Sequence, residues 1–263
     1  MEITRRRALF SAGGLAAGCA VATAEIVNLS TIPLSATNQI PGKMRIVVCG
    51  GHPGDPEYGC GGTVARLTAL GHDVVLLYLN DGAWPPTPPS TRKAEAAKAC
   101  GILQARLAYA GQVNGHAVVD PAHYDDFRKL IAAESPNAVL TQWPIDNHPD
   151  HRAISMLAYN AWQKLGKRFA LYYYEVSNGE DTLQFSPNRY IDITETESQK
   201  REACYAHASQ TPDKYYALQD EVARFRGIER GYKRAEAFLL QLQSPYDIFS
   251  DSGAVLAAHR GID

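Results

Sequence analysis

Four short apolar runs of the strand type each precede a segment whose apolar residues recur at helical spacing. The paired segments are residues 44–50 and 60–71, 72–79 and 90–103, 105–111 and 120–135, and 137–143 and 149–166. This regular alternation predicts an α/β fold, with a mainly parallel sheet covered by helices on both faces. Two further strand-like runs and two further helix-like segments follow: residues 168–176, 188–193, 194–209 and 213–231.

The carboxyl ends of the predicted parallel strands carry conspicuous polar segments. Ligands of such sheets bind in the crevice beyond these strand ends. The segment GGHPGDPE follows the first strand, LNDGAW ends the second, and QWPIDNHPDH ends the fourth. Loops from three strand ends can therefore converge on one site.

The first 24 residues have the pattern of an export signal. Three arginines open the segment, a small and weakly apolar stretch follows, and an A-x-A sequence closes it before Glu25. The arginine pair resembles a twin-arginine signal, which predicts an exported protein, either periplasmic or extracellular. A lipoprotein processed at Cys19 is a weaker alternative. We expect residues 25–43 to form a linker and residues 44–263 to form a single domain.

Composition and charge exclude several classes of protein. The chain of 263 residues is long enough for one large core. Its formal net charge of −2, with both signs interspersed, does not match the basic surface of nucleic-acid-binding proteins. After the N-terminal segment the chain has no apolar run of 18 residues, so we expect no membrane span in the mature protein. No oligomeric state follows from the sequence.

Histidine and aspartate cluster in two of the three polar loops. His52 and Asp55 are three residues apart, and His148, Asp150 and His151 crowd the turn into a helix. Catalytic zinc commonly takes three protein ligands, often histidines with a carboxylate. The spacing favours a metal held by the first pair and by one histidine of the second cluster, while the other histidine stays free for acid–base or electrostatic work. The structural alternative is that Asp150 only caps its helix.

A dinucleotide site in the first loop is disfavoured. The Rossmann fingerprint G-x-G-x-x-G needs small residues where the backbone approaches a pyrophosphate. His52 and Pro53 occupy that turn instead. A nucleotide-binding protein, as a third alternative, would require an affinity for a dinucleotide that this turn argues against.

Two segments of the chain resemble a known family. GGHPGDPEYGCGGTVARLTALGHDVVLLYLNDG, together with WPIDNHPDHRA, is similar to the LmbE-like (PIG-L) family of zinc-dependent N-deacetylases. The similarity runs from about Met44 into the helix after His151 and continues more weakly through YIDIT. It implies a Rossmann-like fold and hydrolysis of N-acetyl groups, commonly from molecules that contain N-acetylglucosamine.

The resemblance also implies roles for individual residues. Carried over by position, it places Zn²⁺ on His52, Asp55 and His151. It makes His148 the group that stabilises the oxyanion, as an imidazolium, or protonates the leaving amine. Asp150 would orient a histidine. Zinc would lower the pKa of the water that acts as nucleophile and would polarise the acetyl carbonyl.

One position departs from the family motif. Members usually carry His-Pro-Asp-Asp, in which the first aspartate is the general base, and Gly54 stands at that position here. A general base typically contributes about 10²–10⁴-fold to the rate. We expect Asp146 or Asp81 to supply the base instead. Glu57 is a third candidate, although it alternatively caps the following helix.

The sequence therefore predicts an exported zinc hydrolase that removes an N-acetyl group from a small amino sugar or glycoconjugate. The alternative is a catalytically impaired, saccharide-binding protein of the same fold, because Gly54 removes the usual base. Release of acetate would separate these two functions. Trp84 and Trp143 could stack on a sugar ring, although aromatic residues near strands usually belong to the core.

Overall fold

The computed structural model describes residues 42–176 and 182–250, so the predicted export signal, Cys19 and nearly all of the predicted linker lie outside the described residues. The strands are β1 (Arg45–Gly50), β2 (Asp73–Asn80), β3 (Arg106–Gln112), β4 (Ala138–Gln142), β5 (Ala170–Tyr174), β6 (Arg189–Asp192) and β7 (Ala235–Leu240). The helices are α1 (Asp55–Ala69), α2 (Pro89–Ile102), α3 (Pro121–Glu134), α4 (Pro149–Lys164), α5 (Glu197–Tyr205), the 3₁₀ turn η2 (Ala208–Gln210) and α6 (Pro212–Ile228). None of the helices in these ranges is long and apolar enough to cross a membrane.

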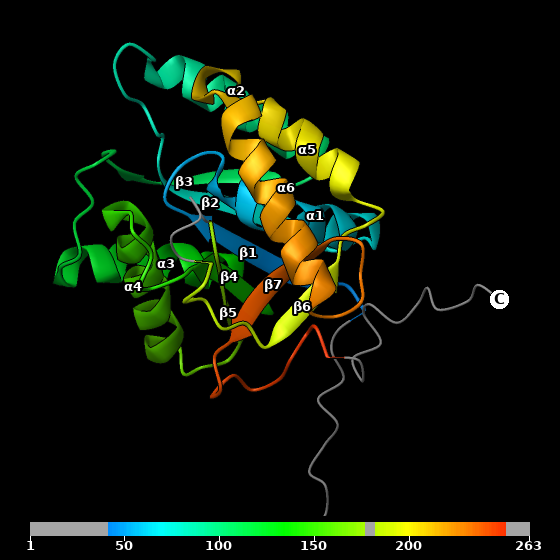
Figure 1. Ribbon diagram of the computed structural model, residues 1–263. Coiled ribbons are helices and arrows are strands. Elements are labelled where there is room, and N and C mark those ends of the chain that lie inside the picture. Colours follow the sequence, from blue (N-terminus) through cyan, green and yellow to red (C-terminus); the bar gives the residue numbers. More distant parts are fainter. Residues whose placement is uncertain (1–41, 177–181, 251–263) are drawn as a thin grey trace, which may run out of the picture. The chain divides into compact units, whose positions relative to one another are not determined.

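The strands form one mixed sheet in the order β3-β2-β1-β4-β5-β7-β6 (Figure 1). The first five strands of this order are parallel, whereas β7 runs antiparallel to both β5 and β6. The chain steps outward from β1 through β2 and β3 and then returns to the other side of β1 with β4. This reversal places the usual ligand crevice between the loops that follow β1 and β4. The predicted α/β class and mainly parallel sheet are confirmed.

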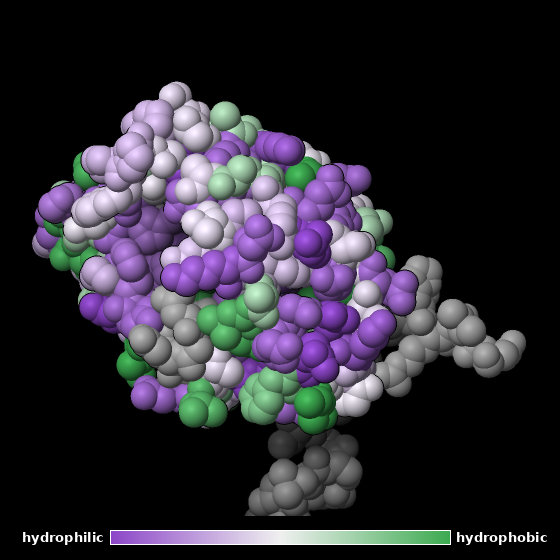
Figure 2. Space-filling view, turned by 45° about the horizontal axis from the view of Figure 1, so that its top comes forward, coloured by the Kyte–Doolittle hydropathy of each residue, from purple (hydrophilic) through white to green (hydrophobic). Residues whose placement is uncertain are grey.

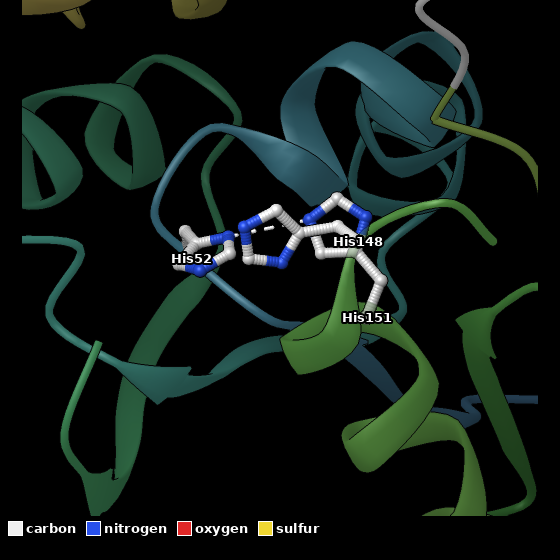
Figure 3. A group of neighbouring side chains, drawn as sticks. All are labelled: His52, His148 and His151. Atoms are coloured by element: carbon white, nitrogen blue, oxygen red, sulfur yellow. Dashed lines mark hydrogen bonds between the residues drawn. The ribbon is translucent and has the colours of Figure 1, made fainter. Parts of the chain in front are cut away.

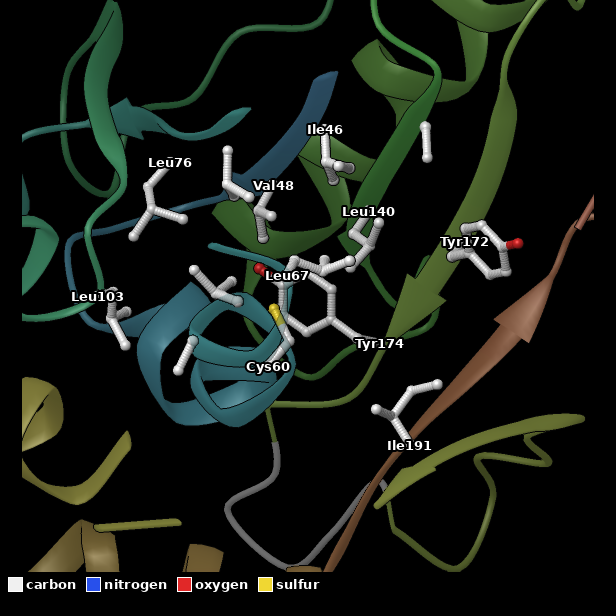
Figure 4. Packing of buried hydrophobic residues seen from close by; sticks show 14 of the residues in the cluster. Ile46, Val48, Cys60, Leu67, Leu76, Leu103, Leu140, Tyr172, Tyr174 and Ile191 are labelled. Atoms are coloured by element: carbon white, nitrogen blue, oxygen red, sulfur yellow. The ribbon is translucent and has the colours of Figure 1, made fainter. Parts of the chain in front are cut away.

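Helices cover both faces of the sheet, and successive residues of β1 alternate between the two cores. Ile46 and Val48 belong to a core on one face that also contains residues of α1, α2, α5 and α6, and Figure 4 shows part of this cluster. Val47 and Cys49 pack against α3 and α4 on the other face. A strand with both faces covered reads as a continuous apolar run, which is why this run stands out in the sequence.

Two elements differ from the sequence pattern. The predicted elements omit β7, because Glu236 interrupts its short apolar run. The helix α1 begins at Asp55, five residues before the predicted start at residue 60. Three glycines in its first two turns obscure the helical pattern, but Pro56 at the start of the helix and the capping contact of Glu57 establish it there.

A buried carboxylate from β7 anchors α1 at a kink. Cys60 has φ −147° and ψ 22°, so the helix is interrupted there and starts again. The Glu236 carboxylate accepts hydrogen bonds from the amides of Gly62 (2.9 Å) and Thr63 (2.7 Å), at the start of the second helical segment. The Lys200 ammonium lies 2.7 Å from the same carboxylate, and both side chains are almost fully buried. Glu236 thus compensates a buried cation and two backbone donors at once.

We expect Glu236→Gln to lower the free energy of unfolding by about 3–5 kcal/mol, because it leaves the Lys200 charge buried without a counter-charge. Urea denaturation followed by circular dichroism measures this change. Glu221→Gln is the matched control, since the pair that Glu221 forms with Arg224 is exposed, and its loss should cost less than about 1 kcal/mol. Equal losses in the two variants would contradict the anchoring role.

Candidate metal centre

The loops after β1 and β4 bring the predicted histidines together. His52 lies in the turn between β1 and α1, while His148 and His151 lie at the beginning of α4 (Figure 3). A ring nitrogen of each histidine can be chosen so that all three lie within 4.8 Å of one another. Gly51 permits this approach, because a Cβ there would lie only 2.8 Å from Cδ2 of His151.

Three side-chain atoms form a compact donor set: His52 Nδ1, Asp55 Oδ2 and His151 Nε2. Nδ1 and Oδ2 are 3.2 Å apart, Oδ2 and Nε2 are 3.0 Å apart, and Nε2 and Nδ1 are 3.2 Å apart. Ligand atoms about 2.0–2.2 Å from one Zn²⁺ lie roughly 3–3.5 Å from each other. The three residues that the resemblance assigns to the metal therefore fit the ion in both chemistry and spacing.

The charge distribution around the donor set favours a bound cation. Burial by itself would lower the pKa of His151, but the carboxylates of Asp55 and Asp146 outweigh it and raise this pKa to about 10. Burial would likewise raise the pKa of Asp55, yet His151 and His52 hold it well below its usual range. The buried carboxylates thus stabilise positive charge at the donor atoms, as a divalent ion requires.

A second carboxylate orients each histidine of the donor set. Asp150 Oδ2 lies 3.1 Å from Nε2 of His52, and Asp146 Oδ1 lies 2.9 Å from Nδ1 of His151. Each contact occupies the ring nitrogen outside the donor set, and so directs the other nitrogen into it. The contact expected for Asp150 is present, and Asp146 makes an equivalent one.

The Asp150 carboxylate is held by residues that the sequence patterns did not single out. Its Oδ2 accepts hydrogen bonds from Asn80 Nδ2 (3.0 Å) and from the Gly115 amide (2.8 Å). Although burial would raise the pKa of Asp150, the contacts with His52 and Gly115 lower it to about 2. Asn80 could have been found as a polar residue at a strand end. Gly115 contributes only its backbone and leaves no signal in the sequence.

His148 is the N-cap of α4, with its ring beside the donor set. Its Nδ1 accepts a hydrogen bond from the Asp150 amide at 3.2 Å, and its ring centroid lies 4.7 Å from those of His52 and His151. A nitrogen that accepts an amide N–H is unprotonated, so the neutral ring carries its proton on Nε2. Burial and the two neighbouring imidazoles lower the pKa of His148. The contact with Asp150 and the lowered pKa both favour a neutral ring, whereas the resemblance implies an imidazolium.

Two of the carboxylates expected to replace the base have other contacts. The contact of Asp146 with Nδ1 of His151 holds its carboxylate across the ring from the donor set. Asp81 accepts a hydrogen bond from the Ala83 amide at 3.1 Å and lies 3.6 Å from the Lys93 ammonium. These positions do not support either aspartate as the general base. They give Asp146 a positioning role and Asp81 a role in its own loop.

The third candidate, Glu57, caps α1. Its Oε2 accepts a hydrogen bond from the Gly54 amide at 3.1 Å, and its Oε1 contacts the Tyr78 hydroxyl (2.6 Å) and His207 Nε2 (2.9 Å). This matches the capping alternative predicted for Glu57. Gly54 has φ 112° and ψ −40°, a conformation that residues with a Cβ rarely adopt. The position that carries an aspartate in the family motif thus lies, in this chain, in a turn whose backbone conformation favours glycine.

Comparison with known proteins identifies the segment that carries this centre. Residues 47–162 match the PIG-L family, described as GlcNAc-PI de-N-acetylase. The diacetylchitobiose deacetylase of Thermococcus kodakarensis is 28% identical over 212 residues, which cover 70% of this chain and 78% of that protein. Among solved structures, the conserved protein TT1542 of Thermus thermophilus has a TM-score of 0.69 and 28% identity, and the alignment covers 79% of this chain and 99% of that one.

The same fold also supports other chemistry. The 4-carboxy-2-hydroxymuconate hydratase of Pseudomonas putida has a TM-score of 0.67 with 18% identity, and the alignment covers 78% of this chain and 98% of that one. At this identity the likeness concerns the fold alone. The family match is narrower, because it spans both histidine loops and every residue of the donor set. The comparisons thus show a match of residues 47–162 to the PIG-L (LmbE-like) family model, over the segment that contains the whole donor set.

Proposed function

We propose that this protein is a zinc-dependent hydrolase that removes an N-acetyl group from an amino sugar or glycoconjugate of the N-acetylglucosamine type, and that it acts after export. The observation that carries the proposal is the donor set of His52, Asp55 and His151, with donor atoms 3.0–3.2 Å apart and the imidazole of His148 beside them. The names of the matched family and of the Thermococcus relative support the choice of bond and sugar.

Each residue around the donor set has a distinct task in this proposal. Zn²⁺, when bound, supplies a water of lowered pKa and an electrophile for the carbonyl oxygen. Asp150 and Asp146 accept from the ring nitrogens outside the donor set and so keep the other nitrogen of each histidine directed into it. His148 donates its Nε2–H to the carbonyl oxygen as negative charge develops there. A neutral ring suffices for this hydrogen bond, because its Nε2 carries the proton.

The glycine at position 54 favours a second candidate, a protein that binds a saccharide without hydrolysing it. The usual general base is absent from that position, and the contacts of Asp146, Asp81 and Glu57 direct none of them to replace it. Such a protein would show saturable affinity for the saccharide and would release no acetate. Both candidates share the donor set, so the presence of metal alone does not separate them.

The first experiment measures metal content and acetate release together. We expect residues 25–263, purified without chelator, to contain about one zinc per chain and to release acetate from diacetylchitobiose. His151→Ala should lose the metal and the activity, because it removes one of three protein ligands. Elemental mass spectrometry and an acetate assay give the two readouts. Zinc without acetate would favour the binding protein, and absence of zinc after its addition would contradict the hydrolase and leave only the binding protein.

Removing either orienting carboxylate should weaken the metal site. We expect Asp146→Asn and Asp150→Asn each to lower zinc affinity by about 10–100-fold, because the attached histidine loses its fixed orientation. Competition with a chromogenic chelator measures this affinity. Asp81→Asn is the matched control and should retain the affinity of the wild type, since Asp81 contacts Ala83 and Lys93 instead. A loss of affinity in Asp81→Asn equal to that in the other two variants would contradict these assignments.

Replacement of His148 should affect turnover rather than metal binding. We expect His148→Phe to lower kcat by about 10²–10³-fold, because the hydrogen bond to the developing oxyanion is lost. Zinc content should stay near that of the wild type, since the donor set does not include His148. Steady-state kinetics and elemental analysis test the two halves of this expectation. A variant that turns over normally, or that loses its zinc, would show that His148 has another role.

A further inference from the structure

Large apolar side chains are exposed in the three loops that surround the donor set. Trp84, Val113 and Ile145, which follow β2, β3 and β4, are 65%, 65% and 62% exposed. Scattered exposed apolar residues are ordinary, and the face in Figure 2 shows them in small groups among hydrophilic residues. Trp84, Val113 and Ile145 differ from such scattered residues in their place along the chain. Each lies within four residues, in sequence, of a group that forms a hydrogen bond with Asp150 or His151.

A cleft of about 350 Å³ opens beside one of these exposed apolar residues, Val113, between the end of β3 and α3. Ligand pockets commonly measure about 300–1,000 Å³, so this volume can hold a small organic group. Val113 is thus both one of the three exposed loop residues and part of the lining of the cleft. The apolar part of the lining consists of Ala110, Val113, Val118, Phe127 and Leu130.

One ordered loop separates the cleft from the donor set. The Gln112 side chain bonds both the amide (2.6 Å) and the carbonyl (3.1 Å) of Val118, and so closes the loop at its base. On one side of the loop the Gly115 amide donates to Asp150, and a Cβ at Gly115 would lie 3.7 Å from the Trp84 ring. On the other side Val113 and Val118 line the cleft. The same short loop thus lines the cleft and contacts Asp150, the carboxylate that orients His52.

The charges in the cleft select a neutral occupant. None of the residues that line it is a lysine or an arginine. Its acidic residue, Asp126, lies 2.8 Å from the Lys129 ammonium, and the His123 ring lies 2.7 Å from the Asp120 carboxylate. A phosphate group placed here would meet the Asp126 carboxylate and no lysine or arginine. An alkyl or aryl group would instead cover apolar surface that is exposed to water.

We propose that this cleft binds the neutral, apolar aglycone of an N-acetylglucosaminide whose acetamido group lies at the donor set. The inference rests on the proposed deacetylase function and narrows its substrate class to glycosides with an alkyl or aryl substituent. Trp84 and Val113 border the loop over which such a substituent passes. The sugar and its acetamido group then bind in the polar centre, and the substituent binds against the apolar side chains of the cleft.

Two glycosides that differ only in their aglycone test this proposal: methyl and hexyl N-acetyl-β-D-glucosaminide. We expect the hexyl glycoside to bind at least about tenfold more tightly by calorimetry, and to have a correspondingly higher kcat/KM, because its additional methylenes are buried. Leu130→Ser should abolish most of this difference through Kd and KM. Leu242→Ser is the matched control, since Leu242 is 87% exposed and follows β7, which four strands of the sheet separate from β3.

Each outcome of this test has a definite meaning. Equal affinities for the two glycosides, or a difference that Leu130→Ser leaves unchanged, would overturn the inference while acetate release upheld the proposed function. If Leu242→Ser removes the difference in affinity between the two glycosides to the same extent, the aglycone binds elsewhere, and the inference is overturned. If neither glycoside releases acetate, the hydrolase proposal fails. The ratio of the two Kd values still shows whether the cleft binds the aglycone. A dimer that Leu130→Ser dissociates would show that a second copy of the chain occupies the cleft, and would overturn the inference as well.

Discussion

The contact between the end of β1 and the start of α4 is the constraint on which the rest of the centre depends. A side chain at Gly51 would collide with the His151 ring, so only glycine lets these two elements meet. Their contact brings His52 and Asp55, from one crossover, to His151 from another. The reversal of strand order between β1 and β4 makes these loops neighbours although about 100 residues separate them in sequence.

Buried charge then determines the details. A carboxylate in a buried position is costly unless it is paired, and Asp55, Asp146 and Asp150 each pair with an imidazole. The pairs hold both rings in place before any ion arrives, which reduces the reorganisation that binding requires. The same contacts explain why the general base is hard to identify, because the carboxylates of Asp146 and Asp150 already contact imidazole rings.

Much of this arrangement could be predicted from the sequence. Strands buried on both faces give continuous apolar runs, and the spacing of His52 and Asp55 indicates shared chemistry. Predictions were weaker where the determining contact crosses the chain. Asp146 was expected to be a base, because only its position in the loop was visible, and its bond to His151 requires the fold. β7 was missed because the charge of Glu236 has its partner, Lys200, in a distant helix.

The anchors of α1 have a consequence for the limits of the folding unit. The family match ends at residue 162, yet Glu57 meets His207, and the kink of α1 depends on Glu236. A fragment cut at the end of the match would keep every proposed metal ligand. It would expose the face of α1 that α5 and β7 cover, would remove His207 from Glu57, and would leave the two backbone amides that Glu236 accepts from without their partner. The segment that contains the proposed metal ligands is thus shorter than the segment that is needed for a stable fold.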